Sequence, residues 1–496
     1  MSAEPPQGYL GAEARIGSGP APELVEAGYA LELADAPLLH RGFGLADLAH
    51  VLALAEQGAV LPADERALLG ALLELHEADV AEITGDPRYG DLANLRERAL
   101  EQRIGTAAGW LNAGRPRREA GRIAFRIALR ERVLDLAQAV ARHAAALVEL
   151  AARERDTLMP DYTYLQAAQP TTVGHWALSF AFPALRDAER LRRDLAWVNR
   201  SPGGAGGVNG SRFPLDRERL AQLLGFAAPV AHTRDGMWQT DGLADLVSHA
   251  AIAATGASRF AEDLELYGSD EFGLLRIGDA LCRASALMPQ KRNPYALVVL
   301  RGGAGTLIGR ATGVLTTQRT PSGRTDNLLY AYGEVCGAVE LGARLLRLAA
   351  ATAESVTVDA PRAAAAVRDS HALATDLAEV VSRAAGLDYR SAYRVVGRAV
   401  ATAGRLDAAA LDAAAAELLG RSLELPDDVV ADALDPLAAL ATRTVPGGAA
   451  PEPMDAMLAD CRAAVADARA WIDAERAGIA EAAERLVALA RQRVGG

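Results

Sequence analysis

Residues 122–159 read RIAFRIALRERVLDLAQAVARHAAALVELAARERDTLM, a run of 38 residues without glycine or proline. As one α-helix this run would extend about 57 Å, at about 1.5 Å per residue. A helix of that length is longer than a compact domain and needs apolar partners along its sides. We therefore expect a packed helical bundle within one chain or between subunits. Two shorter helices joined by a kink remain the alternative. The apolar stripe that predicts the helix recurs every three or four residues: Phe125, Leu129, Val133, Leu136, Val140 and Leu147.

The rest of the chain also favours helices. No stretch alternates apolar and polar residues as a half-buried strand would, so we predict an all-α fold. The glycine- and proline-rich residues 1–25 predict a loose arm. The loop Gly203–Gly210 lacks the Lys-Ser/Thr of a phosphate-binding loop, which favours a tight turn between helices. Further helical patterns lie at about 174–199, 216–225, 241–267, 295–318, 328–357, 362–386 and 454–476.

Composition excludes several classes of protein. The 496 residues are 50% hydrophobic and 23% charged, enough to bury a large core. With 52 basic and 64 acidic residues the net charge is −12, which gives no basic surface for nucleic acid or anionic lipid. Three scattered cysteines and histidines without metal-ligand spacing argue against a disulfide scaffold and a metal site. Without a signal-like or membrane-spanning segment, we expect a soluble, cytoplasmic protein.

The segment from Ser285 to Pro294, SALMPQKRNP, departs from the surrounding helical pattern. It places a hydroxyl, the ammonium of Lys291 and the carboxamide of Asn293 within nine residues, on a stretch interrupted by two prolines. A serine is a poor base unless nearby positive charge stabilises its alkoxide, and a lysine could do so or hold an anionic substrate. From the residues alone, a plain surface loop is the competing interpretation.

The stretch ASALMPQKRNP closely resembles the GSSxMPxKxNP signature of the aspartase/fumarase superfamily, in the form carried by argininosuccinate lyases. Residues 163–170, TYLQAAQP, resemble the T-H-LQ-x-AQP segment of that family, and similar motifs extend the resemblance over roughly residues 45–470. The resemblance implies an all-helical, three-domain subunit, with domains at 1–110, 111–362 and 363–496. It also implies a homotetramer whose active sites each draw on three subunits, and a cofactor-independent anti β-elimination that releases fumarate.

Roles follow from the resemblance by position. Ser285 occupies the position of the family's catalytic base. Lys291 and Asn293 occupy the positions of the residues that stabilise the doubly charged aci-carboxylate and bind substrate. A fixed cation and amide donors suit that role because they favour charge that develops after deprotonation. Thr163 and Gln169 fall in the segment expected to bind substrate.

Departures from the family pattern are as informative as the matches. Tyr164 occupies the position of the family's catalytic histidine. Val298 occupies the position of the glutamate that pairs with that histidine. The two losses agree with each other, because a buried carboxylate without its partner is unfavourable. With a free pKa of about 10, a tyrosine can donate a hydrogen bond or proton but cannot mimic an imidazolium. It could equally be filler for the vacated space.

The family motif GRSRND reads GRPRRE at residues 114–119. Arg115 and Arg117 match residues that bind a substrate carboxylate, and Arg118 is an addition. Three guanidiniums would suit a polyanionic substrate, although Arg118 could simply face solvent.

We therefore expect a lyase that eliminates fumarate from an N-substituted aspartate, a small dicarboxylate, with a leaving group that differs from arginine. A true argininosuccinate lyase and a non-catalytic structural tetramer on the same fold are the alternatives.

Overall fold

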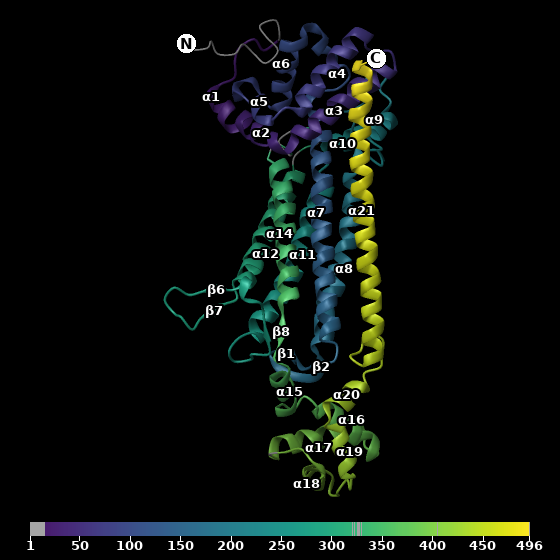
Figure 1. The fold of residues 1–496 in the computed structure, drawn as a ribbon. Helices are drawn as coiled ribbons and strands as arrows, with labels where there is room; N and C mark the ends of the chain where they lie inside the picture. Colours follow the sequence, from purple (N-terminus) through teal and green to yellow (C-terminus); the bar gives the residue numbers. More distant parts are fainter. Residues whose placement is uncertain are drawn as a thin grey trace.

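The computed structural model describes residues 15–495 except 320, 322, 325–327, 329 and 404, so residues 1–14 of the expected arm lie outside it. Figure 1 shows an elongated molecule with long helices along its length, a helical region at one end and a smaller helical group at the other. Strands are few and short, which confirms the all-α prediction. The bundle contains α7 (Arg117–Arg153), α8 (Val173–Val198), α11 (Asp241–Tyr267), α12 (Tyr295–Thr316) and α14 (Tyr332–Ser355).

The central helix α7 is one continuous helix of 37 residues, not two with a kink. It packs against α8, α14 and α3 (Ala36–Glu56), and its leucines and valines form the middle of the largest buried cluster. The prediction placed it at 122–159, but it begins five residues earlier and ends at Arg153. The next residues form a hairpin of β1 (Leu158–Thr163) and β2 (Gln166–Thr172), which the sequence did not reveal.

Three arginines at four-residue spacing lie buried along α7. Arg126 donates to the carbonyls of Trp197 (2.7 Å) and Val198 (3.3 Å), at the C-terminus of α8. Arg130 donates to Gly225 O (2.7 Å), just beyond α9 (Arg217–Leu223). Burial lowers the pKa of Arg122 to about 9 and that of the other two to about 10. Arg126 and Arg130 therefore balance the negative ends of neighbouring helices inside the fold.

The N-terminal region is centred on α3 (Ala36–Glu56), which packs on α7 and α4. This helix is long and apolar enough to cross a membrane, but 83% of its apolar window is buried inside the molecule, as expected of a core helix. The other elements of this region are α1 (Pro22–Leu24), the π-helix η1 (Val25–Tyr29), α2 (Ala30–Ala34), α4 (Pro62–Glu77), α5 (Val80–Ile83), η2 (Pro87–Tyr89), α6 (Leu92–Ile104) and η3 (Gly105–Asn112).

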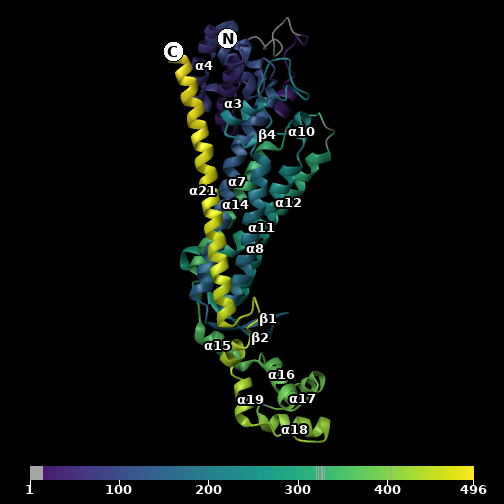
Figure 2. The same ribbon diagram turned by 90° about the vertical axis from the view of Figure 1, so that its right-hand side faces the viewer.

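The C-terminal part differs from expectation in two ways. The helix predicted at 362–386 is two helices, α15 (Ala360–Asp369) and α16 (Ala374–Ala384), separated by residues 370–373. The helix predicted at 454–476 continues as α21 to Gly495 and runs back along the bundle, against α7 and α8, to reach α4 (Figures 1 and 2). Most of the buried residues of α21 as far as Ile472 belong to the cluster of the bundle, and Leu486 and Ala490 belong to that of the N-terminal region, whereas the small cluster at the far end includes no residue of α21. The helices are α15 (Ala360–Asp369), α16 (Ala374–Ala384), α17 (Tyr389–Thr402), α18 (Ala408–Leu419), α19 (Asp427–Ala433), α20 (Pro436–Ala441) and α21 (Pro451–Gly495).

Short elements connect the long helices. Each remaining strand has two residues and pairs with one other strand. They are β3 (Arg200–Ser201) with β4 (Ala228–Pro229), β5 (Leu275–Arg276) with β8 (Thr357–Val358), and β6 (Arg283–Ala284) with β7 (Arg292–Asn293). The short helices are α10 (Thr233–Trp238), η4 (Asp279–Leu281) and η5 (Thr317–Arg319).

Candidate active site

Ser285 directly follows β6, and the loop between β6 and β7 projects from the side of the bundle (Figure 1). Strands β6 and β7 close the loop, and Asn293 Nδ2 donates to Arg283 O across them (3.0 Å). Ser285 Oγ accepts the backbone N–H groups of Leu287 (3.3 Å) and Met288 (3.0 Å). Two donors aimed at one hydroxyl oxygen stabilise negative charge on it, which a serine base requires.

The remainder of this loop is open to solvent. Lys291 is exposed and Leu287 is 85% exposed, so the loop contributes little to the core of its own chain. Pro289 and Pro294 keep the segment out of a helix, and α12 begins only at Tyr295. The arrangement presents Ser285, Lys291 and Asn293 away from the bundle to which they belong.

Tyr164 occupies the tip of the β1–β2 hairpin, and its side chain is fully exposed. Tyr164 and Leu165 have φ angles of 53° and 58°, a left-handed conformation that is unusual for two successive residues with side chains. The hairpin itself requires it, because a two-residue loop between antiparallel strands favours positive φ at both of its residues. Thr163 and Gln169 are also exposed, on the two strands that carry the tip.

The three arginines near the start of α7 each meet a carboxylate of their own chain. Arg115 is buried and donates to Asp47 Oδ1 (2.6 Å). Arg118 makes a two-point contact with Glu32, with both distances at 2.9 Å. Arg117 pairs with Asp91 and lies 3.6 Å from Glu32. We expected these guanidiniums to bind substrate; in the single chain, Arg115 serves the fold, and Arg117 and Arg118 are held by acidic side chains.

Glu119 explains the conformation of the glycine-rich loop, because the loop binds its side chain. The sequence did not suggest this contact. Its buried carboxylate accepts the N–H groups of Gly204 (2.6 Å) and Gly206 (2.7 Å). Both glycines have positive φ, which points successive N–H groups at one anion. Burial raises the pKa of Glu119, and the two N–H groups oppose that shift. The loop therefore binds a carboxylate of its own chain, that of Glu119.

The single chain does not bring the three predicted regions together. Arg117 starts α7 and Tyr164 follows its end, so about 55 Å of helix separates them, at about 1.5 Å per residue. The Ser285 loop leaves the side of the bundle between these two ends (Figure 1). Within the described residues, no group of three or more His, Cys, Asp or Glu side chains could hold a metal ion.

Comparison with known proteins identifies the family. Residues 44–309 match the model of a lyase family, and residues 371–441 match that of the argininosuccinate lyase C-terminal region. The argininosuccinate lyase of Methanoculleus marisnigri is 36% identical over 453 residues, which cover 90% of this chain and 92% of the relative. The chain belongs to the argininosuccinate lyase-like branch of the aspartase/fumarase superfamily. It is a carbon–nitrogen lyase of that type.

Other relatives of this lyase agree. The argininosuccinate lyase of Halobacterium salinarum is 35% identical over 439 residues, 87% of each chain. Among solved structures, an EDDS lyase variant with bound fumarate has a TM-score of 0.85 at 27% identity and covers 96% of this chain and 97% of its own. A class II fumarase from Schistosoma mansoni shares the fold, with a TM-score of 0.70 at 14% identity over 84% of this chain and 92% of its own.

Proposed function

We propose that this lyase eliminates fumarate from an N-substituted aspartate whose leaving group differs from arginine, and that a homotetramer forms its active sites. The observation that carries the proposal is the retained Ser285 loop, whose hydroxyl oxygen already accepts two N–H donors. The relatives named argininosuccinate lyase and EDDS lyase support elimination at a carbon–nitrogen bond. The fumarate bound in an EDDS lyase variant supports a small dicarboxylate product.

The surface of α12 supports assembly. Val298, Ile308 and Leu315 are each about half exposed on this helix, an unusual environment for apolar side chains. Added Cβ atoms at Gly302 and Gly309 would meet nothing within 4 Å, so the face is also flat and open. Small and apolar residues on one helix face allow another helix to approach closely. Chains packed through this face could bring a Ser285 loop to the Tyr164 hairpin of one neighbour and the arginines of another.

The proposed chemistry follows from these residues. Ser285 takes a proton from the carbon beside one carboxylate, and Lys291 and Asn293 stabilise the resulting aci-carboxylate. That electron pair then forms the carbon–carbon double bond of fumarate as the carbon–nitrogen bond breaks. The departing amine needs a proton, and the exposed phenol of Tyr164 is the proposed donor. A substrate carboxylate would bind Arg117 and Arg118 in competition with Asp91 and Glu32.

The changes from the family pattern support an altered leaving group. Tyr164 replaces an imidazole with a phenol, and Val298 removes the acidic partner of that imidazole. Val298 is exposed on α12, where an unpaired glutamate in an interface would be unfavourable. The residues for proton abstraction are kept while those around the leaving group differ. We also expect the protein to be soluble and cytoplasmic.

The test is to supply argininosuccinate, EDDS and a panel of N-succinyl amines, and to follow fumarate by its ultraviolet absorbance. We expect turnover of at least one N-succinyl amine to exceed that of argininosuccinate. Ser285→Ala should reduce the rate by at least about 100-fold, the lower end of general-base catalysis. Ser370→Ala is the matched control, because Ser370 Oγ also accepts a backbone N–H two residues on (3.4 Å) but lies in the C-terminal part.

Two results would decide against the proposal. Faster release of arginine from argininosuccinate than of any other amine would make this protein an argininosuccinate lyase. No fumarate from any substrate, with wild-type and Ser285→Ala proteins indistinguishable, would favour a structural tetramer.

A further inference from the structure

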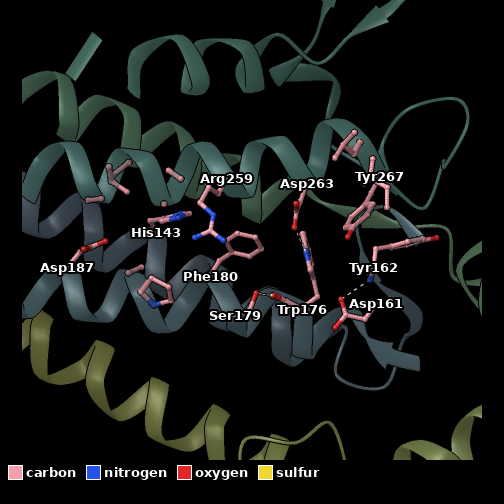
Figure 3. A pocket seen from close by; sticks show the side chains of 18 of the residues that line it. His143, Asp161, Tyr162, Trp176, Ser179, Phe180, Asp187, Arg259, Asp263 and Tyr267 are labelled. Carbon is pink, nitrogen blue, oxygen red and sulfur yellow. Dashed lines mark hydrogen bonds between the residues drawn. The ribbon is translucent and has the colours of Figure 1, made fainter. Parts of the chain in front are cut away.

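A groove of about 560 Å³ lies between α8 and α11, and we call it the α8–α11 groove. Its size is in the range of sites that hold small organic molecules. Figure 3 shows side chains from both helices pointing into it, with Tyr162 and Asp161 of β1 at one end. Tyr164 and Leu165, at the tip of the hairpin, also line it. The groove therefore opens beside the residue that we propose faces the leaving group.

Aromatic side chains are concentrated at the hairpin end of the groove. The chain has only 8 Phe, 5 Trp and 11 Tyr in 496 residues, yet five of these line the groove. Trp176 meets Phe180 edge-on at 5.6 Å between ring centroids and Tyr267 at 6.0 Å. Tyr162 packs on Tyr267 at 5.6 Å. Rings in this arrangement can present negative faces, which attract an organic cation.

The charged residues of the groove also favour a cation over an anion. Three carboxylates line it, those of Asp161, Asp187 and Asp263, against the single guanidinium of Arg259 among the described lining residues. Trp176 Nε1 donates to Asp263 Oδ2 at 2.9 Å, which fixes that carboxylate beside the rings. Burial raises the pKa of Asp263 and brings that of Asp187 to about 6, so Asp187 is ionised at pH 7.5. An anion such as fumarate is disfavoured here.

His143 supplies an unsatisfied polar atom. It lines the groove from α7, is 3% exposed, and its Nδ1 has no hydrogen-bond partner among the described residues. Burial lowers the pKa of His143 to about 4, so the ring is neutral at physiological pH and adds no positive charge. The backbone of Ala349, on α14, interacts with the same ring and opposes that shift.

We propose that the α8–α11 groove binds an organic ammonium on an apolar body, the amine half of the substrate, through the aromatic rings that line its hairpin end and the carboxylate of Asp263. This inference rests on the proposed elimination and deepens it, because it names the leaving group as an amine with a bulky apolar or aromatic part. The succinyl half would then lie beyond Tyr164, toward the Ser285 loop and the arginines of neighbouring chains. The anionic succinyl half would thus face the arginines, and the cationic amine half would face the carboxylates of the groove.

The test is calorimetric titration of the full-length assembled protein with benzylamine, and with fumarate for comparison. We expect saturable binding of benzylamine that persists without fumarate. Asp263→Asn should weaken it at least 10-fold, since the amide oxygen can still accept from Trp176 but the charge is gone. Phe180→Leu should weaken it several-fold through loss of a ring. Glu189→Gln, an exposed carboxylate of α8 outside the groove, should leave the affinity unchanged.

Failure of this inference is distinguishable from failure of the proposed function. If the protein releases fumarate from N-succinyl amines but benzylamine binding is absent, or equal in wild type and Asp263→Asn, the groove is not the amine site. If benzylamine binds as expected and no substrate yields fumarate, the elimination is wrong and the groove remains a cation site.

Discussion

Replacing Asp47 by asparagine should destabilise the protein strongly. Asp47 accepts hydrogen bonds from Arg96 Nε (3.1 Å) and Nη2 (2.9 Å) and from Arg115 Nη2 (2.6 Å), and all three residues are at most 4% exposed. Asp47→Asn keeps the shape but leaves two buried guanidiniums without a counter-charge. Removing one partner of a buried ion pair costs roughly 3–5 kcal/mol. An unfolding entropy of about 2.1 cal/mol/K per residue over the 496 residues gives about 1 kcal/mol/K. The melting temperature should therefore fall by about 3–5 °C.

The assay is thermal unfolding followed by circular dichroism at a fixed protomer concentration, because assembly contributes to the melting temperature. Glu131→Gln is the matched control: its ion pair with Arg41 is about half exposed on both sides, and such a pair is worth about 0–1 kcal/mol. We expect a shift of about 1 °C or less for this control. If Asp47→Asn melts within 1 °C of wild type, the buried triad is not what holds Arg115, and Arg115 returns to the substrate-binding candidates.

Other expectations concern three further side chains. Tyr164→Phe should lower kcat/KM at least 10-fold with no change in melting temperature, because the side chain is fully exposed; an unchanged kcat/KM would make Tyr164 filler. Glu32→Gln should release Arg118 and lower KM for a polycarboxylate about 5-fold, equivalent to about 1 kcal/mol, whereas a raised KM would show that Glu32 helps to bind substrate. The pKa of His143 is about 4 in the folded chain against an ordinary value of 6.5, so the unfolded chain binds more protons between these values and stability should fall as pH drops from 6.5 to 4. His143→Gln should flatten that part of a denaturation-against-pH curve, and an identical slope would contradict the assignment.

The long helices could be predicted because their signal is local. The predicted helix at 241–267 coincides with α11, and that at 174–199 differs from α8 by one residue at each end. The local sequence predicted helix ends poorly where tertiary contacts override helix propensity. Gly478 predicts an end to the last helix, yet α21 continues through it because its later residues pack against α4. The β1–β2 hairpin was missed because its tip uses two residues in the left-handed region and not glycine.

The candidate site divides in the same way. The types and spacing of Ser285, Lys291 and Asn293 could be read from the chain, because they belong to one short loop. The partners of the arginines could not, since Asp47, Glu32 and Asp91 lie 26–86 residues away and only folding brings them into contact. The same holds for the α8–α11 groove, whose rings come from the β1–β2 hairpin, α8 and α11.

The order of residues alone determined a helical protein with a loop that carries Ser285, Lys291 and Asn293, because helix periodicity and a ten-residue motif depend on neighbouring positions. Folding decided which charges face a ligand and which neutralise each other. A guanidinium is free or occupied only according to what the rest of the chain places within about 3 Å of it. That neighbour depends on packing across the whole bundle.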